Sequence, residues 1–329
     1  MHYQPIERAP GAFQEPLSVE AIKRISARAF GATSRVESVA ELPWGSYNSA
    51  YRIDLASADT VVLRVAPAPE RQFRVERSLL RNEYTAAPHL APLGDLLPRS
   101  LFADFTRQVI NRDYLMQTLL PGVPAPEGMR RYERSQWSAF FRQVGGVTRK
   151  LHEVRGPGFG FVAGPWFETW SAALIDYFRT AAGDIADAGQ DAYDVHELAA
   201  TTERLRGELD EITEPRLLHG DGWTANFLVD PATPDLTLTG ICDWDRARWG
   251  DPMADWAIQR ALLRPGSERD TFWDGYGQPR TVASGVRQLI YQARFLVELR
   301  LDYIRNAMAD EIASSYDDVG HILGRLRSS

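Results

Sequence analysis

The chain has 329 residues, of which 44% are hydrophobic and 25% are charged, and it carries a net charge of −7. These values indicate an ordinary soluble globular protein with room for one large domain or two smaller ones, and the acidic balance argues against wholesale binding to nucleic acid. The single cysteine, Cys242, excludes an internal disulfide framework and a cysteine-cluster zinc site.

Lysine is scarce in this chain. Only Lys23 and Lys150 occur among the 37 basic residues, and all the others are arginines. A Walker A phosphate-binding loop ends in Gly-Lys followed by Ser or Thr, and neither lysine has that setting. The sequence therefore lacks the phosphate cradle of the P-loop enzymes.

The sequence shows no targeting segment. Residues 1–20 contain charged side chains without an apolar run, and no stretch approaches the ~20 apolar residues that span a bilayer. We therefore expect a cytoplasmic protein that binds neither a membrane nor nucleic acid.

The first 120 residues or so predict a small, mostly antiparallel sheet with one or two helices. Apolar residues at helical spacing predict helices, and runs of β-branched residues predict strands. Helices are expected at 17–30 and 71–90, and strands at 36–43, 48–55, 60–67, 98–105 and 108–120.

A proline- and glycine-containing break at 119–124 separates this sheet from a mostly helical remainder. A β-rich front, a breaker and a helical back predict two lobes joined by a hinge, with a ligand cleft between them. The predicted N-lobe is 1–117, the hinge 118–122 and the C-lobe 123–329. Helices are expected at 133–152, 166–183, 195–212, 252–264 and 281–313, and strands at 225–230 and 236–243.

Two segments of the predicted C-lobe carry side chains suited to phosphoryl transfer. In HGDGWTAN (219–226), the amide of Asn226 follows the carboxylate of Asp221 by five residues, and Asp243 follows a predicted strand. An Asn and an Asp brought together in this way can bind Mg²⁺ through oxygen. Asp221 can then orient a substrate hydroxyl and accept its proton, so that positioning and charge stabilisation perform most of the catalysis.

These segments resemble those of the aminoglycoside phosphotransferase family, the small-molecule relatives of the protein kinases. HGDGWTAN resembles the HGD-x₄-N catalytic loop, and ICDWDRARWGDPMADWA (241–257) resembles the segment that replaces the kinase DFG motif. The resemblance implies an α+β, bilobal, protein-kinase-like fold with a small β-rich N-lobe and a larger, mainly helical C-lobe. It implies Asp221 as catalytic base and Asn226 and Asp243 as Mg²⁺ ligands, with Asp255 as an internal brace and His219 holding the loop.

The segment TVVLRVAP (60–67) resembles the strand whose basic residue contacts the nucleotide phosphates, with Arg64 where many kinases have lysine. Arginine suits this role because it is permanently charged and binds phosphate through two parallel hydrogen bonds. Glu83, on the following predicted helix, is the expected ion-pair partner of Arg64, and Glu76 is the alternative.

The resemblance also points to two nucleotide-binding segments. Ser46 lies in the Gly45-Ser46-Tyr47-Asn48 turn that would cover the phosphates, and this turn has a single glycine. Met116-Gln117-Thr118-Leu119 falls where the family binds the nucleobase through its hinge, which implicates Gln117 and Leu119.

The resemblance implies ATP or GTP as phosphoryl donor and a hydroxyl of a sugar-containing small molecule as acceptor. The pattern is closer to hygromycin-type and macrolide phosphotransferases than to the compact kanamycin kinases, so an antibiotic of aminoglycoside, macrolide or nucleoside type is the first expectation. Choline, homoserine and fructosamine kinases share the core motifs, so a housekeeping metabolite kinase is the alternative. A pseudokinase-like binding module is disfavoured, since all three site residues are present.

Aromatic and acidic residues near the motifs are candidates for binding the acceptor. Trp223 and Trp249 could form an aromatic wall for a sugar or heterocycle, and core packing is the alternative. Asp245 could support the metal or form an ion pair. Glu298 and Asp302, in the C-terminal helical segment, could hold ammonium groups. Arginines are interleaved with these acids, and they favour a solvated, salt-bridged face instead.

Overall fold

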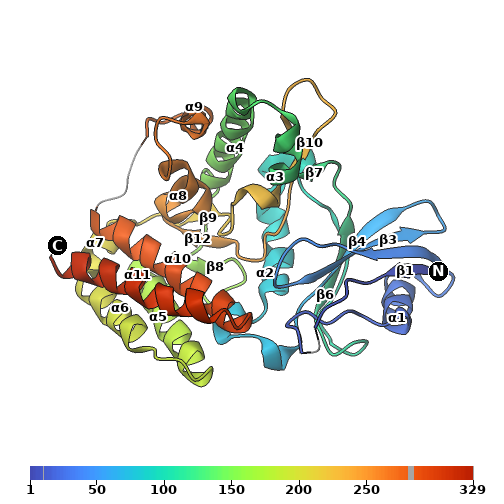
Figure 1. Cartoon of the computed structure of the whole chain (residues 1–329), viewed down its shortest axis with the longest axis horizontal. Coiled ribbons are helices and arrows are strands. Elements are labelled where there is room, and N and C mark those ends of the chain that lie inside the picture. Colours follow the sequence, from blue (N-terminus) through green and yellow to red (C-terminus); the bar gives the residue numbers. More distant parts are fainter. Residues whose placement is uncertain (10, 281–284, 329) are drawn as a thin grey trace.

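The structure is a computed structural model that describes residues 1–9, 11–280 and 285–328. A β-sheet part and a helical part lie side by side along the long axis of the molecule, with α2 (Leu79–Ala86) between them (Figure 1). This arrangement is the predicted α+β, two-lobed architecture. The exact lobe boundaries stay a prediction, since residues 119–122 simply link the last strand of the sheet to the next strand of the chain.

The N-terminal sheet has six strands in the order β1-β2-β3-β4-β6-β5, and only the β1–β2 pair is parallel. Each of the predicted strands is present, although the structure shortens them at their ends. β1 was not predicted, because three residues are too short to show a pattern. The strands are β1 (His2–Gln4), β2 (Val36–Glu41), β3 (Ser49–Leu55), β4 (Thr60–Val65), β5 (Ser100–Asp104) and β6 (Tyr114–Thr118).

Helices cover both faces of this sheet. α1 (Val19–Phe30) begins at Ser18, whose side chain caps the helix, and buries Ile22 and Ile25 against one face. α2 packs on the opposite face through Leu80. The helix predicted at 71–90 is divided into shorter pieces, because Ser78 adopts a left-handed conformation with φ 65°.

The C-terminal part contains two small sheets among helices. The first has the order β11-β10-β7 and the second β8-β12-β9. The predicted strands at 225–230 and 236–243 are confirmed as the hairpin of β10 and β11. The strands are β7 (Val123–Pro124), β8 (Gly160–Phe161), β9 (Arg216–Leu218), β10 (Phe227–Asp230), β11 (Thr237–Ile241) and β12 (Arg248–Gly250).

The helices pack into two large cores, one around α4, α8 and α9 and the other around α5, α6, α10 and α11. The α-helices of this part are α3 (Ala125–Gly128), α4 (Trp137–His152), α5 (Trp170–Asp187), α6 (Tyr193–Arg204), α7 (Arg206–Asp210), α8 (Trp256–Leu262), α9 (Thr271–Tyr276), α10 (Gly285–Arg305) and α11 (Ala309–Arg327). Short 3₁₀ helices are η1 (Pro69–Arg71), η2 (Arg74–Glu76), η3 (Ala87–Leu96), η4 (Met129–Arg131), η5 (Arg134–Gln136), η6 (Thr224–Asn226), η7 (Pro252–Ala254) and η8 (Glu268–Asp270).

The single helix predicted over 281–313 is wrong in its extent. The chain forms two helices there, α10 and α11, because Ala307 adopts φ 53° and interrupts the helical path. Residues 281–284 of that prediction lie outside the described residues. Within the described part of the chain, no helix has the length and apolar character needed to span a membrane.

Helices α4 and α9 approach each other closely at Gly145. A Cβ atom on Gly145 would lie 2.0 Å from the carbonyl oxygen of Phe272, whereas the nearest atom to a Cβ on Gly146 would be 3.8 Å away. The neighbouring glycines on α4 therefore differ sharply in the space around them.

We predict that Gly145→Ala destabilises the protein by about 1–3 kcal/mol, because the backbone of α9 must move away to admit the methyl group. Gly146→Ala is the matched control and is expected to be neutral or to stabilise by up to about 1 kcal/mol, since alanine is the better helix former. Urea denaturation of both variants measures the difference. Equal stabilities would show that the α4–α9 contact tolerates expansion.

Candidate active site

The β10–β11 hairpin brings two predicted metal ligands to one of its ends. Asn226 directly precedes β10, and Asp243 follows β11. Phe227 pairs with Ile241, and the Cys242 N–H donates to the Asn226 carbonyl oxygen at 2.9 Å. Asp243 has φ 64°, a conformation that non-glycine residues adopt only where the surroundings impose it. The backbone conformation of Asp243, and with it the direction of its side chain, is therefore set by the surrounding fold.

The loop before this hairpin holds Asp221 against Asn226. The Asn226 amide donates through Nδ2 to the Asp221 carboxylate at 3.0 Å and to its carbonyl oxygen at 2.8 Å. The Asp221 N–H donates to Nδ1 of His219 at 3.3 Å, so this imidazole holds the loop as the sequence predicts. Gly220 has φ 78°, and a Cβ there would lie 2.0 Å from the Arg246 carbonyl oxygen. Only glycine fits that position.

The surroundings of Asp221 adjust its acidity. Burial raises the pKa of Asp221 to about 7, against the opposing effect of nearby Arg246 and with the help of Asp243 and Glu298. A general base works best when its pKa lies near the working pH. The carboxylate of Asp221 is therefore suited to accept a proton near neutrality.

Asp255 fixes the backbone of the Asp221 loop from behind. Its carboxylate is fully buried and accepts the N–H groups of His219 at 2.9 Å and Gly220 at 3.3 Å. It also forms a hydrogen bond with Nε2 of His152 at 3.0 Å. The other ring nitrogen of His152, Nδ1, lies 2.9 Å from the Tyr276 hydroxyl. Burial alone would raise the pKa of Asp255, but these hydrogen bonds outweigh it and lower the pKa. Asp255 occupies the position of the brace that the family resemblance implies.

Arg64 is the centre of a buried ionic cluster between the two parts of the molecule. Its Nη1 lies 3.1 Å from Oε2 of Glu83, and its Nη2 contacts Asp243 and lies 3.8 Å from Asp245. Gln117 donates to Glu83 at 2.9 Å and orients it. The expected Arg64–Glu83 ion pair is thus present. Glu76, the alternative partner, pairs with Arg246 and Arg305 instead.

The acids around Arg64 respond to it differently. Burial opposes ionisation of Asp243, but the adjacent guanidinium outweighs it and lowers the pKa of Asp243. Burial and the charge of Asp243 raise the pKa of Asp245. Three carboxylates therefore share one buried guanidinium, and they are not all compensated by it.

Two asparagines that the sequence analysis did not single out fasten the metal-ligand segment to the N-terminal part. Asn82 donates to the carbonyl oxygens of Asp245 and Ala247, each at 2.8 Å, and Asn48 donates to the Asp245 carboxylate at 2.8 Å. Asn48 lies in the predicted phosphate loop and Asn82 precedes Glu83, but nothing in the local sequence marks either as a bridge. The assignment of Asp245 as an ion-pair partner or metal support remains a prediction, and its side chain is buried among these contacts.

Asn226 and Asp243 fit Mg²⁺ by the chemistry of their donor atoms. Because Asn226 uses Nδ2 toward Asp221, its Oδ1 remains as an oxygen donor, and Asp243 contacts Arg64 through Oδ1 alone. Mg²⁺ in nucleotide-dependent enzymes is held by one or two such groups together with waters and substrate phosphates. Such a site needs no group of three acidic, histidine or cysteine side chains placed to hold a metal ion, and the described residues contain no such group.

The predicted nucleotide-binding residues lie in three different settings. Ser46 is in the turn after β2, and its hydroxyl lies 3.4 Å from Asp302 of α10. Gln117 lies within β6, pairs with strands on both sides and acts on the site through Glu83. Leu119 follows β6 and is 41% exposed.

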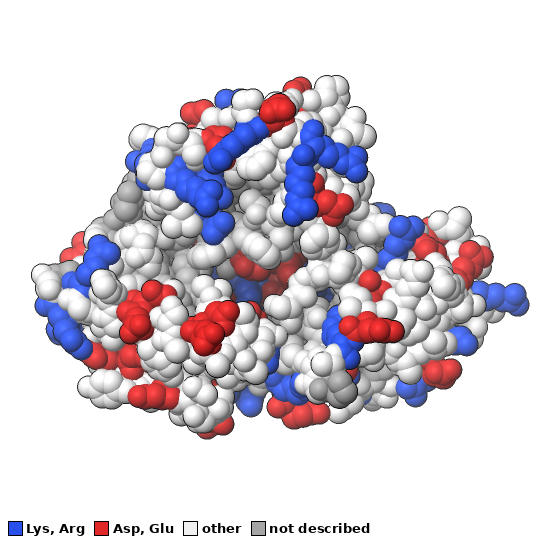
Figure 2. Space-filling model, viewed as in Figure 1, with Lys and Arg blue, Asp and Glu red and all other residues white. Residues whose placement is uncertain are grey.

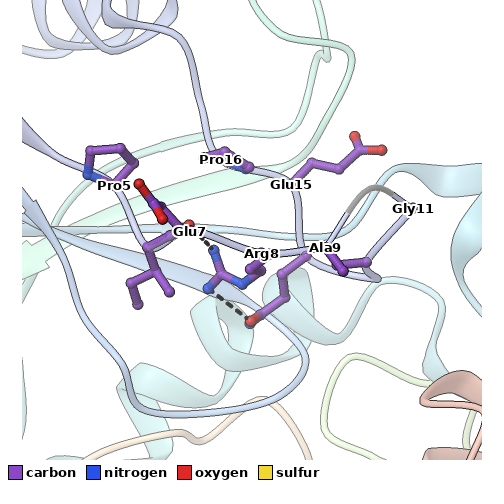
Figure 3. A pocket seen from close by; sticks show the side chains of 10 residues that line it. Pro5, Glu7, Arg8, Ala9, Gly11, Glu15 and Pro16 are labelled. Atoms are coloured by element: carbon purple, nitrogen blue, oxygen red, sulfur yellow. Dashed lines mark hydrogen bonds between the residues drawn. The ribbon is translucent and has the colours of Figure 1, made fainter.

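The N-terminal segment supports the turn that contains Ser46. Gln14 donates to the carbonyl oxygens of Gly45 at 3.3 Å and Asn48 at 3.0 Å, and Arg8 in turn holds Gln14. This segment curls around a hollow of about 520 Å³, lined in part by Arg8 and Glu15 (Figure 3). The hollow is formed by the segment itself and not by any of the predicted catalytic residues.

The two candidate tryptophans have opposite settings. Trp223 is 44% exposed beside Asp221 and remains a candidate for acceptor contact. Trp249 as an aromatic wall is wrong, because it is fully buried in β12, where a Cβ on Gly156 would lie 2.3 Å from its ring. Trp244 is buried as well and packs on His219 with ring centres 4.2 Å apart.

The acids of α10 lie near the site but are already paired. Glu298 accepts from Arg246 at 2.5 Å and from Arg294 at 3.1 Å, and Asp302 accepts from Arg305 at 2.6 Å. The expected salt bridges are thus present. The expectation of a solvated face is wrong, because Arg305 is largely buried.

The fold is kinase-like, as the solved structures it resembles show. The chain superposes on a ternary complex of a thermostable mutant of aminoglycoside phosphotransferase APH(4)-Ia with AMP-PNP and hygromycin B, with a TM-score of 0.63, 18% identity and coverage of 94% of this chain and 99% of that one. It superposes on the GDP and kanamycin complex of APH(2″)-IIIa with a TM-score of 0.62, 16% identity and coverage of 92% and 98%. These likenesses show the fold.

The sequence profile of the phosphotransferase enzyme family matches residues 38–288. The chain therefore belongs to the phosphotransferase enzyme family, and the resemblance and the kinase-like fold predicted from its motifs are confirmed. No curated protein matches the chain in sequence.

We predict that Asp255→Asn lowers the free energy of unfolding by about 1.5–3 kcal/mol at neutral pH, because the amide replaces one acceptor of charge-assisted hydrogen bonds with a donor. The folded-state pKa of Asp255 lies below its unfolded value, so its stabilisation is complete above about pH 4 and is lost as the pH falls through the folded pKa. The difference in unfolding free energy between wild type and Asp255→Asn should therefore narrow below about pH 4, and urea denaturation at several pH values measures it.

Asp235→Asn is the control, because Asp235 is exposed in the β10–β11 turn. Its effect is expected within about 0.5 kcal/mol. A gap between wild type and Asp255→Asn that is constant with pH would contradict the role of the ionised carboxylate.

Proposed function

We propose that the chain transfers the terminal phosphoryl group of ATP or GTP, together with Mg²⁺, to a hydroxyl of a sugar-containing small molecule. An antibiotic of aminoglycoside, macrolide or nucleoside type is the first expected acceptor, and the transfer would confer resistance. The observation that carries the proposal is one connected set of contacts: Asn226 holds Asp221, the Cys242 N–H binds the Asn226 carbonyl oxygen next to Asp243, and Arg64 contacts Asp243. A base, two oxygen ligands and a phosphate-binding cation thus lie together.

Asp221 is assigned the role of base. Its carboxylate would accept the hydroxyl proton as the acceptor oxygen bonds to the terminal phosphorus and the bond to the bridging oxygen breaks, releasing the nucleoside diphosphate. Asn226 keeps Asp221 in one orientation through its amide. Such positioning lowers the barrier because the reacting oxygen is held in line before the transfer.

Arg64 is assigned the nucleotide phosphates. Its guanidinium is held in place by Glu83 and Gln117, so its charge is ordered before a ligand arrives. Asn226 and Asp243 would hold Mg²⁺, which would neutralise charge on the transferred group. Ser46 would lie over the phosphates and Leu119 beside the nucleobase.

The solved neighbours support this assignment, since they are complexes with AMP-PNP and hygromycin B or with GDP and kanamycin. A housekeeping kinase for choline, homoserine or a sugar amine would use the same phosphate-side residues. The acceptor alone separates it from a resistance enzyme. A screen of antibiotics and metabolites by mass shift, with ATP and with GTP, decides between them.

We predict that Asp221→Asn lowers kcat by about 10²–10⁴, because the amide keeps the shape of the side chain but accepts no proton. Binding of the nucleotide should be retained, since Asp221 is assigned no phosphate contact. The measurement is turnover of the best acceptor from the screen together with the Kd of a nonhydrolysable nucleotide. Near-normal turnover would disprove the assignment of Asp221.

We predict that Arg64→Ala weakens nucleotide binding by at least about tenfold, because a charge-assisted contact to phosphate contributes about 1.5–3 kcal/mol. Arg64→Lys should restore part of the loss, because lysine keeps the charge but not the paired geometry. Arg52→Ala on the adjacent strand β3 is the control, since its half-exposed side chain pairs with Asp54, further along the strand than the residue opposite Arg64. Nucleotide titration calorimetry on folded protein measures all three, and equal affinities would contradict the role of Arg64.

A further inference from the structure

A second ionic cluster lies next to the catalytic loop on the acceptor side. We call Arg246, Arg248 and Arg294 the arginine cluster; Glu298 lies among them. Arg246 and Arg248 follow the metal-ligand segment, and Arg294 and Glu298 are one turn apart on α10. A recess in the middle of the face drawn in Figure 2 exposes both acidic and basic side chains in its depth.

The arginine cluster adjoins the loop that carries Asp221. The backbone carbonyl oxygen of Arg246 packs against Gly220, the residue before Asp221. The Arg246 side chain pairs with Glu298, which also binds Arg294. A molecule whose hydroxyl faces Asp221 would therefore place its remaining groups against this cluster.

Both oxygens of Glu298 are occupied by arginines. Glu298 accepts from Arg246 through Oε1 and from Arg294 through Oε2. Although burial opposes it, Arg246 and Arg294 lower the pKa of Glu298 to about 2. This carboxylate therefore has neither a free oxygen nor an uncompensated charge to offer to an ammonium group.

Arg248 has no acidic partner among the described residues. Its Nε donates to the Arg246 carbonyl oxygen at 3.2 Å, and its guanidinium lies over the Phe161 ring at 4.9 Å. Its Nη2 is buried without a hydrogen-bond partner, although only 6% of the residue surface is exposed. Burial and the neighbouring Arg294 lower the pKa of Arg248 to about 9. The shift expresses how unfavourable this uncompensated positive charge is.

Further unpartnered donors surround Arg248. Nε and Nη1 of Arg294 and the hydroxyl of Tyr177 are buried without partners. Tyr177 comes from α5, and the guanidinium of Arg294 lies over its ring at 5.6 Å. A guanidinium keeps its proton in proteins, and buried donors of this kind are normally paired. The group that pairs best with several guanidinium donors at once is an oxyanion.

We infer that the acceptor carries an oxyanion, a carboxylate or a phosphate, which Arg248, Arg294 and Tyr177 bind while its hydroxyl faces Asp221. The inference rests on the proposed function and narrows it. Among sugar-containing acceptors it selects acidic ones over polycations, whose ammonium groups would meet an excess of buried positive charge.

The test uses probes that differ in charge and share a sugar ring. Glucuronate and glucose 6-phosphate are the acidic probes, glucose is the neutral one and glucosamine the cationic one, with inorganic phosphate as the minimal oxyanion. Thermal unfolding of the full chain is followed at millimolar concentrations of each, with Mg²⁺ and AMP-PNP present to occupy the nucleotide side. The acidic probes or phosphate should raise Tm, and glucose and glucosamine should not. The carboxylate and phosphate probes distinguish the two sources of the oxyanion.

Arg248→Met is the decisive variant, and Tyr177→Phe removes a single donor without changing charge. Replacing a buried, unpaired charge by an apolar chain of similar length does not destabilise the unliganded protein, so Arg248→Met should fold and lose the oxyanion response. Tyr177→Phe should weaken the response severalfold. Arg179→Met, which removes an exposed arginine of α5 paired with Glu203, is the control and should respond as wild type does.

Three results would overturn the inference. They are an oxyanion response that is the same in Arg248→Met as in wild type, no response of wild type to any oxyanion, and a larger response to glucosamine than to glucuronate. Failure of the proposed function is recorded separately, as an absence of nucleotide binding or of Asp221-dependent phosphate release. An oxyanion response that depends on Arg248 in a protein that binds no nucleotide would retain the site and reject the kinase.

Discussion

The ionic cluster at Arg64 joins the two parts of the molecule through one buried guanidinium. The residue comes from β4, in the middle of the N-terminal sheet, and its carboxylate partners come from α2 and from the segment after β11. A guanidinium presents several donors in a fixed plane, so it contacts Glu83 and Asp243 at once, which a single ammonium point charge does poorly. Removing it would leave buried carboxylates facing one another.

This constraint gives the arginine bias of the sequence a local meaning. A lysine at residue 64 would hold one of these acids well and leave the geometry of the other unspecified. Gln117 and Asn48 complete the arrangement by binding Glu83 and Asp245 from the N-terminal side. The side of the site proposed to bind the phosphates is therefore ordered by contacts between protein side chains.

The rigidity of the catalytic loop originates far from its own sequence. Helix α4 ends at His152, and α9 ends at Tyr276, which contacts His152. His152 then holds Asp255, which fixes two backbone N–H groups of the loop before Asp221. The close approach at Gly145 sets the distance between α4 and α9. Packing of two helices is thereby transmitted to the position of the base.

Much of the site could be predicted from the sequence, because its residues lie in short segments whose residue spacing is typical of phosphoryl-transfer motifs. The loop with Asp221 and Asn226 and the strand before Asp243 were identified this way, and the fold followed from the motifs. Trp249 was misjudged because adjacency to the motif says nothing about the direction of a side chain in a short strand. The strand β12 turns it inward, onto space left by Gly156.

Other features had no local signal at all. Tyr177 and Arg294 are brought together by the packing of α5 against α10, and their missing partners become visible only in three dimensions. Asn82 binds the backbone of Asp245, which lies 163 residues further along the chain. Contacts of this kind depend on the assembled core and not on the period of any single segment.

Negative charge is in excess on one side of the Asp221 loop and positive charge on the other. The sign of each excess indicates the kind of ligand that would complete that side. On the nucleotide side acids outnumber the one guanidinium, which suits a site completed by a divalent cation. On the proposed acceptor side Arg248 has no acidic partner among the described residues and Arg294 shares Glu298 with Arg246, which suits a site completed by an anion. The two sides meet at consecutive residues, Asp245 and Arg246, so each excess partly balances the other in the unliganded protein. A cationic acceptor would add positive charge beside the arginine cluster. An acidic acceptor would neutralise that cluster, and the metal ion bound with the nucleotide would neutralise the carboxylates around Arg64.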